Sequence, residues 1–259
     1  MRLPLYHVDA FTSRVFGGNP AGVVPLSSWL DDATLQSIAA ENNLSETAFF
    51  VGGSGRYAIR WLTPQTEVDL CGHATLASAF VIFTRLEPGL EGVEFSSKSG
   101  TLRVTRAGDL LALDFPARPA RQVDLTGALQ AALGARPKEV WAARDLMAVY
   151  ETEDEVRDLK PDLPLLSAFD SFAVLVTAPG RKSDFVSRFF APRQGVPEDP
   201  VTGSAHCTLV PYWAKRLGKS KLHALQVSAR GGELFCEDRG DRVSIGGRAV
   251  LYLEGTLEV

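Results

Sequence analysis

The chain is poor in cysteine, in basic clusters and in long apolar runs. Three cysteines, a small and odd number for 259 residues, exclude a disulfide framework. The net charge of -4 and the lack of a basic stripe argue against a general nucleic-acid binder. No apolar run is long enough to cross a bilayer, and the N-terminal segment reaches a charged residue too early for a signal-peptide core. We therefore expect a cytoplasmic protein without nucleic-acid or membrane partners.

The sequence also lacks the spacings of two common ligand sites. Neither Gly17-Gly18 nor the stretch 52–55 is followed by the Lys-Ser/Thr of a phosphate-binding loop, so both are interpreted as turns. No zinc-motif spacing of cysteine and histidine is present. The neighbours His206 and Cys207 would point about 100° apart on a helix, which favours packing over chelation of one ion. No metal site is predicted.

Two segments of the chain resemble each other and carry the strongest functional signal. They are 63–75 and 196–208, and each passes from proline through acidic residues to a glycine beside small polar residues. A helix that begins at such a glycine presents unpaired backbone N–H groups and the positive end of its dipole, which suits a carboxylate. Two such helix starts suggest two related halves that face one ligand across a cleft.

The rest of the chain is predicted to consist of many short strands and few helices. The stretch 73–86 carries almost no charge, which is typical of a buried helix. Helices are expected at 31–42, 73–86, 125–134, 153–159 and 204–217. Strands are expected at 5–11, 21–25, 46–51, 57–62, 92–95, 100–106, 110–115, 139–143, 146–151, 171–177, 225–229, 233–237, 242–246 and 249–258.

These elements favour an α+β fold in which strands close around one apolar helix in each half, as a curved sheet or open barrel. Two prolines within four residues, Pro116 and Pro119, favour an extended connector. We therefore predict two pseudo-symmetric domains, 1–117 and 118–259, with the last strand able to pack back on the first domain.

Four motifs in this order resemble the phenazine-biosynthesis isomerase family, whose fold is shared with diaminopimelate epimerase and proline racemase. The resemblance covers essentially the whole chain. It implies two pseudo-symmetric epimerase-like domains, no cofactor, a small carboxylic acid as substrate and a homodimer. It also implies a biosynthetic proton-transfer isomerisation. The motifs are Val8–Phe11 with Gly17–Gly22, Glu41–Phe49, Asp69–Thr75 and Glu198–Ala205.

The resemblance also implies roles for individual residues. Glu46 occupies the position of the catalytic glutamate, which acts first as base and then as acid. His73 and Asp199 occupy the positions of supporting catalytic residues. The residues expected to bind the substrate's carboxylate or carbonyl, or to lie beside it, are Gly72, Gly203, Ser204 and Cys71.

Other interpretations stay open at this point. Glu46 could be a solvated residue at the start of a strand, and Asp199 or Ser204 could cap a helix. Cys71 stands where racemase relatives carry a catalytic cysteine, so a Cys71-dependent racemase or epimerase is an alternative. The second segment has Asp199-Pro200 in the corresponding place, which disfavours a symmetric two-cysteine enzyme. A binding protein that catalyses nothing is the third possibility.

Overall fold

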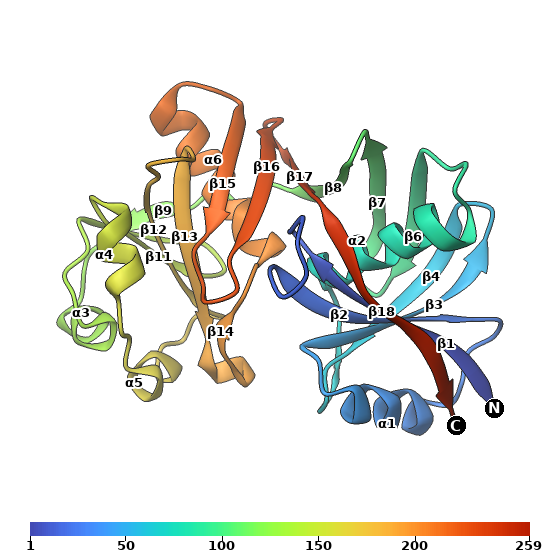
Figure 1. The fold of residues 1–259 in the computed structure, drawn as a ribbon. Helices are drawn as coiled ribbons and strands as arrows, with labels where there is room; N and C mark the ends of the chain where they lie inside the picture. Colours follow the sequence, from blue (N-terminus) through green and yellow to red (C-terminus); the bar gives the residue numbers. More distant parts are fainter. The chain divides into compact units, whose positions relative to one another are not determined.

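Strands occur along most of the chain, and buried and exposed side chains alternate in several of them. In β7, for example, Leu102 and Val104 are buried while Thr101 and Arg103 are exposed, the pattern of a sheet with one covered face. The computed structural model describes residues 1–259 and divides into two units (Figure 1). Unit 1 comprises Met1–Asp114 and Gly246–Val259, and unit 2 comprises Phe115–Ile245. The domain boundary expected between residues 117 and 118 lies close to the point where the chain first passes from unit 1 to unit 2, between Asp114 and Phe115.

Unit 1 consists of one sheet and the helices α1, α2 and η1. Its strands follow the order β18-β1-β2-β3-β4-β6-β7-β8, with β5 as a short extra partner of β4. Its elements are β1 (Arg2–Ala10), β2 (Asn19–Leu26), α1 (Asp32–Asn42), β3 (Glu46–Gly53), β4 (Arg56–Leu62), β5 (Glu67–Val68), α2 (Gly72–Val81), the π-helical η1 (Ile82–Leu86), β6 (Gly92–Ser97), β7 (Gly100–Ala107), β8 (Leu110–Pro116) and β18 (Ala249–Glu258).

Unit 2 is built from the same kinds of elements. Its strands follow the order β9-β10-β11-β12-β13-β15-β16, with β14 as an extra partner of β13. Its elements are β9 (Arg121–Val123), α3 (Gly127–Leu133), β10 (Glu139–Ala142), β11 (Leu146–Val149), α4 (Glu153–Asp158), α5 (Leu163–Ser167), β12 (Val174–Pro179), β13 (Phe185–Ala191), the 3-10 turn η2 (Pro192–Gln194), β14 (Val196–Asp199), α6 (Gly203–Leu217), β15 (Lys221–Gln226), β16 (Gly232–Asp238) and β17 (Arg242–Gly247).

The two units repeat one topology. In unit 1 the pairs β2–β3 and β4–β6 are parallel, and the pairs around them are antiparallel. In unit 2 the parallel pairs are β11–β12 and β13–β15, in the same places. The helix α2 lies in the crossover between β4 and β6, and α6 lies in the equivalent crossover between β13 and β15. The expected α+β fold with two pseudo-symmetric halves is confirmed.

The two crossover helices are the apolar ones that the sequence indicated. Every residue from His73 to Ala79 in α2 is buried, and α2 packs against β1, β2, β3 and β18. α6 packs against β15 and β16. The helix expected at 73–86 is correct in extent but not uniform, because α2 ends at Val81 and continues as a π-helix. There the backbone N–H of Glu87 donates to the carbonyl of Ile82 over 2.7 Å, an i→i+5 bond.

The same two helices differ from the other α-helices at their N-termini. Four helices have a side-chain cap that accepts from a backbone N–H: α1 by Asp31, α3 by Thr126, α4 by Thr152 and α5 by Asp162. α2 begins after Cys71 and α6 after Thr202, and neither residue makes a side-chain cap bond. In these two helices the side chain of the N-cap residue therefore does not satisfy the first N–H groups.

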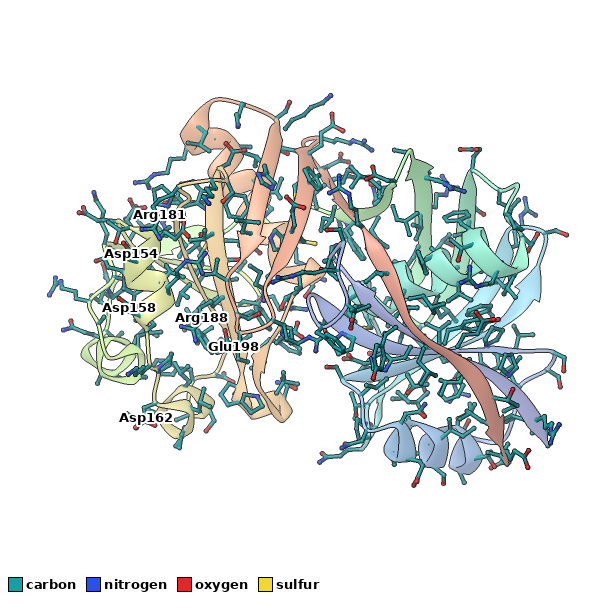
Figure 2. All side chains as sticks on the ribbon, viewed as in Figure 1. Asp154, Asp158, Asp162, Arg181, Arg188 and Glu198 are labelled. Carbon is teal, nitrogen blue, oxygen red and sulfur yellow. The ribbon has the colours of Figure 1, made fainter.

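Two ion pairs connect secondary-structure elements within unit 2, and their residues are labelled in Figure 2. Arg181 pairs with Asp154 of α4 at 2.8 Å, and Arg188 of β13 pairs with Glu198 of β14 at 2.8 Å. The Arg188 guanidinium also donates to the carbonyls of Val156 and Leu159 over 3.1 and 2.9 Å. One cation thus satisfies the C-terminal carbonyls of α4 and joins that helix to two strands. None of the helices is both long and apolar enough to span a membrane.

One predicted strand has the wrong bounds because a polar residue points inward. A strand was expected at 225–229, but β15 is Lys221–Gln226 and its buried positions are Leu222, Ala224 and Gln226. The inward Gln226 breaks the apolar alternation on which the prediction relied. The strand β13, the short helix α5 and the short strands β5, β9 and β14 were not predicted.

Candidate active site

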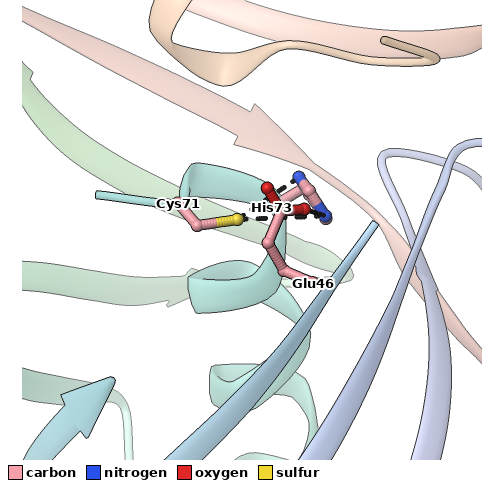
Figure 3. A group of neighbouring side chains, drawn as sticks. All are labelled: Glu46, Cys71 and His73. Carbon is pink, nitrogen blue, oxygen red and sulfur yellow. Dashed lines mark hydrogen bonds and ion pairs between the residues drawn. The ribbon is translucent and has the colours of Figure 1, made fainter. Parts of the chain in front are cut away.

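A carboxylate and an imidazole meet at the start of α2 (Figure 3). Glu46 is the first residue of β3, and the parallel pairing of β2 with β3 places it beside Ala21. His73 is the second residue of α2, and its Nε2 lies 3.1 Å from Glu46 Oε2. Only 17% of the Glu46 side chain and 7% of the His73 side chain are exposed. Glu46 therefore begins a strand, as the alternative interpretation expected, but most of its side chain is removed from solvent.

Cys71 completes this cluster. It precedes α2 in an extended conformation, and it is buried. Its Sγ lies 3.5 Å from His73 Nδ1 and 3.9 Å from His73 Nε2 (Figure 3). The residue between them, Gly72, is the first residue of α2. A thiol, an imidazole and a carboxylate are thus gathered at one helix N-terminus.

Burial and charge act in opposite directions on these groups. Burial, and to a smaller extent the Glu46 carboxylate, raise the pKa of Cys71 to about 11, so it is a neutral thiol near pH 7. Burial by itself lowers the pKa of His73, but its interactions with Cys71 and Glu46 outweigh that effect and raise the pKa well above the ordinary value. Because Cys71 is uncharged near neutral pH, Glu46 is the charge that stabilises protonated His73 there.

Asn19 is a neighbour of this cluster that sequence reasoning missed. It is fully buried at the first position of β2, and its Nδ2 lies 3.1 Å from His73 Nδ1. An amide there fixes the plane of the imidazole and keeps Nε2 toward Glu46. The signal was available, because Asn19 lies inside one of the four motifs, but that motif was interpreted as a turn.

The start of α6 in unit 2 is held by a different set of side chains. The Thr202 hydroxyl donates to Asp199 Oδ2, and the Thr202 backbone N–H donates to Gln226 Oε1 over 2.8 Å. Gln226 Nε2 donates to the Asp199 carbonyl over 2.8 Å. Asp199 therefore accepts a hydrogen bond from the residue at the N-cap position of α6. Gln226, which sequence reasoning also missed, fixes the turn that precedes the helix.

Ser204, the second residue of α6, lies beside a cation. Its Oγ accepts from Arg144 Nη2 over 3.2 Å. Arg144 also pairs with buried Asp145, with Nε 3.0 Å from Oδ1, and its guanidinium stacks on Phe172 at 4.1 Å from the ring centroid. A planar cation held on two sides next to an uncapped helix start suits a planar anion such as a carboxylate. Ser204 does not serve as the helix cap.

The predicted site residues thus fall into two groups. Unit 1 brings together Glu46, Cys71, Gly72 and His73. Unit 2 holds the residues of the second helix start, Asp199, Gly203 and Ser204. The expectation that both groups bind one ligand stays a prediction.

Comparison with known proteins shows that the chain is similar to proteins named as isomerases. The profile of the family described as "Phenazine biosynthesis-like protein" matches residues 8–255. An "uncharacterized isomerase" of Pseudomonas aeruginosa is 51% identical over all of both chains. The chain also matches a crystal structure of an Enterococcus faecalis protein of the PhzF family. The match covers 100% of both chains, with 48% identity and a TM-score of 0.98. A hydroxyproline epimerase from Agrobacterium vitis, 12% identical, shares the fold with a TM-score of 0.61 over 99% of this chain and 92% of its own.

Proposed function

Because this chain belongs to the phenazine biosynthesis-like protein family, and relatives in it are named isomerases, we propose that it is a cofactor-independent isomerase of a small carboxylic acid. Glu46 is the acid/base group, and it moves a proton from one carbon of the substrate to another. The observation that supports this most directly is the contact of 3.1 Å between Glu46 Oε2 and His73 Nε2 in a buried setting.

The proposed reaction needs no outside oxidant or reductant. The Glu46 carboxylate takes a proton from a carbon next to a carboxylate or a conjugated double bond, and the C–H electron pair enters the conjugated system. The same carboxyl group then returns the proton to a different carbon, and the double bond shifts. Proton transfer by a positioned side chain contributes about 10²- to 10⁴-fold to a rate.

The surroundings of Glu46 fit this sequence of steps. Negative charge that develops on the substrate would be stabilised by the uncapped N–H groups at Gly72 and by His73, which is charged when it pairs with Glu46. Such donors act strongly because the site is largely removed from water. In unit 2 we assign Asp199 a supporting role, and Gly203 and Ser204 the binding of a carboxylate or carbonyl beside Arg144.

Cys71 is the acid/base group of the alternative proposal, a racemase or epimerase. Its contact with His73 is the observation in favour. Its pKa of about 11 makes the thiolate scarce near neutral pH, so Glu46 is the better base. Loss of activity in Cys71→Ser, with Glu46→Gln still active, would reverse this assignment.

The experiment that tests the proposal is solvent-deuterium incorporation into a panel of small carboxylic acids, followed by proton NMR. Wild type is expected to label at least one acid, and Glu46→Gln is expected to lower the rate at least about 100-fold. Glu41→Gln, an exposed glutamate at the end of α1, is the matched control and should label at the wild-type rate.

Two outcomes would overturn the proposal. Labelling by Glu46→Gln at the wild-type rate would remove Glu46 from the chemistry. Saturable binding of an acid by wild type without any labelling across the panel would favour a binding protein that catalyses nothing.

A further inference from the structure

We propose that Glu46, Cys71 and His73 form a zinc-binding site, and that a bound ion switches off proton transfer by Glu46. The binding itself rests on the positions of the three donors. Only its consequence, inhibition, rests on the proposed function. The three residues come from β3 and from the start of α2, and their ligand atoms all lie within 4.8 Å of one another (Figure 3).

The separations of the donor atoms are close to those of a tetrahedral ion. With Zn–S near 2.3 Å and Zn–N near 2.0 Å, two ligands of one zinc ion lie about 3.5 Å apart. Here Cys71 Sγ lies 3.9 Å from His73 Nε2, and His73 Nε2 lies 3.1 Å from Glu46 Oε2. Small rotations of the Cys71 and Glu46 side chains would bring all three atoms to bonding distance from one point.

The chemistry of the donors selects the kind of ion. A thiolate, an imidazole nitrogen and one carboxylate oxygen favour zinc and its neighbours among the transition metals, whereas magnesium and calcium prefer oxygen donors alone. Three protein ligands leave one position for water or for an anion. The thiol proton of Cys71 and the Nε2 proton of His73 pass to solvent when the ion binds, because the metal ligands are the thiolate and the neutral imidazole.

Asn19 supplies the outer support that such a site requires. A histidine that binds metal through one nitrogen usually engages a polar group through the other, which fixes the ring. The Asn19 side-chain amide lies 3.1 Å from His73 Nδ1 and is fully buried. With the amide turned so that its Oδ1 accepts from the Nδ1–H of His73, Nε2 is left for the ion. The sequence did not predict this site, because Cys71 and His73 are two residues apart, outside the usual zinc spacings, and Glu46 lies on another element.

The consequence of binding follows from the identity of the ligands. The carboxylate oxygen that would accept the substrate's proton becomes a ligand of the ion, and Nε2 of His73 binds the ion in place of its proton. Proton transfer through Glu46 then stops until the ion leaves. Because both effects concern groups of the proposed reaction, zinc is expected to inhibit and not to activate.

Cobalt(II) titration of the full chain, freed of metal by a chelator, tests the binding without any activity measurement. Wild type is expected to bind one ion, with a thiolate-to-cobalt charge-transfer band in the near ultraviolet and the visible bands of a tetrahedral site. Zinc should displace the cobalt. Cys71→Ala is expected to lose the charge-transfer band and at least tenfold in affinity. Cys236→Ala, which removes another buried thiol on β16, should keep both.

A second variant separates loss of metal binding from failure of the protein to fold. Cys71→Ser replaces Cys71→Ala if the latter does not fold by circular dichroism. A wild-type protein without the charge-transfer band, or a Cys71 variant with an unchanged band and affinity, would overturn the metal site.

The deuterium-incorporation assay then tests the inhibition, with chelator or with one equivalent of zinc. Zinc is expected to lower the rate at least tenfold, and chelator should restore it. Undiminished labelling with zinc bound would overturn the inhibition. Failure of the proposed function would show itself separately, as an absence of labelling in chelator while the cobalt bands persist.

Discussion

The two buried histidines at the crossover helices, His73 and His206, are the clearest comparison within the molecule. His73 is the second residue of α2 and His206 the fourth of α6, and they are 6% and 0% exposed. Burial alone would lower the pKa of both. For His206 it does so, to about 4, because its only hydrogen bond is from Nδ1 to the Thr202 carbonyl and no charged side chain contributes. For His73 the net change is upward.

The difference comes from the groups that face each ring: Cys71 and Glu46 face His73, and no ionisable side chain faces His206. The Nε2 of His206 is buried and has no hydrogen-bond partner, and its ring packs 5.8 Å from that of Phe185. The Nε2 of His73 faces Glu46. Two related helices thus carry the same residue type near their start, one as a neutral packing group and one as an ionisable partner of an acid. Proximity to a helix start does not decide the role of a histidine; the charge that faces it does.

The largest expected effect on activity comes from replacing His73, the histidine that faces Glu46. His73→Gln is expected to lower the rate of deuterium incorporation about 100-fold, because a neutral amide cannot carry the charge that stabilises the developing anion. The matched control is His223→Gln, which breaks another His–Glu contact, with Glu233 at 2.8 Å, where both side chains are about one-third exposed. That variant should stay within about twofold of wild type. Equal losses in the two variants would contradict the assignment of His73.

The next effect concerns His206, the neutral histidine, and it is a loss of folding free energy at acidic pH. The pKa of His206 is about 4 when folded and near its ordinary value when unfolded, so the unfolded state binds more protons between these values. Stability contributed by neutral His206 is therefore present above about pH 6.5 and is lost as pH falls toward 4. The loss amounts to about 3 kcal/mol, at about 1.4 kcal/mol per pKa unit.

Denaturant unfolding at several pH values between 7 and 4 measures this contribution. The free energy of unfolding of His206→Gln should depend less steeply on pH than that of wild type, whatever its absolute value. The carboxylates common to both proteins contribute equally to the two curves and cancel in the difference. Parallel curves for wild type and variant would show that His206 is not buried as a neutral group.

Sequence reasoning reached the main elements of this comparison but not its geometry. The two apolar helices were identifiable from their uncharged stretches and glycine-led starts, whereas Glu46, Cys71 and His73 were identified by the family resemblance that the motifs carry. That the Glu46 carboxylate reaches His73 was not identifiable, since it depends on the parallel pairing of β2 with β3 and on the place of α2 in the crossover. Long-range pairing leaves no local signal.

The residues that sequence reasoning missed share one property. Asn19 and Gln226 are buried amides at the end of a strand, and each bonds to groups that are distant in sequence. A period-two apolar pattern cannot single out such a position, because a polar residue there is interpreted as a turn or as the end of a strand. The short helix α5 was missed although Asp162 and Pro164 are typical of a helix start, because only five residues follow the cap.

Gln226 offers a test of how the start of α6 is held around the neutral histidine. Gln226→Ala removes the acceptor of the Thr202 N–H and the donor to the Asp199 carbonyl. A buried group left without a partner costs about 1–3 kcal/mol, so we expect a loss of about 2 kcal/mol in the free energy of unfolding. Gln122→Ala, at an exposed position of β9, should change it by less than about 0.5 kcal/mol. Equal stability of the two variants would mean that Gln226 does not hold this turn.

The smallest effect concerns Asn19, the counterpart of Gln226 at the other histidine. Asn19→Ala removes the contact of 3.1 Å with His73 Nδ1 and leaves Glu46 in place. A hydrogen bond to a charged group contributes about 1.5–3 kcal/mol, and a nearby water can replace part of it, so kcat should fall about tenfold. KM should change little, because the residue orients His73 and does not bind the substrate. Steady-state kinetics at a substrate identified by deuterium labelling separates the two parameters. A raised KM with unchanged kcat would show instead that Asn19 acts on binding, and the imidazole of His73 would then be held by Glu46 and Cys71 alone.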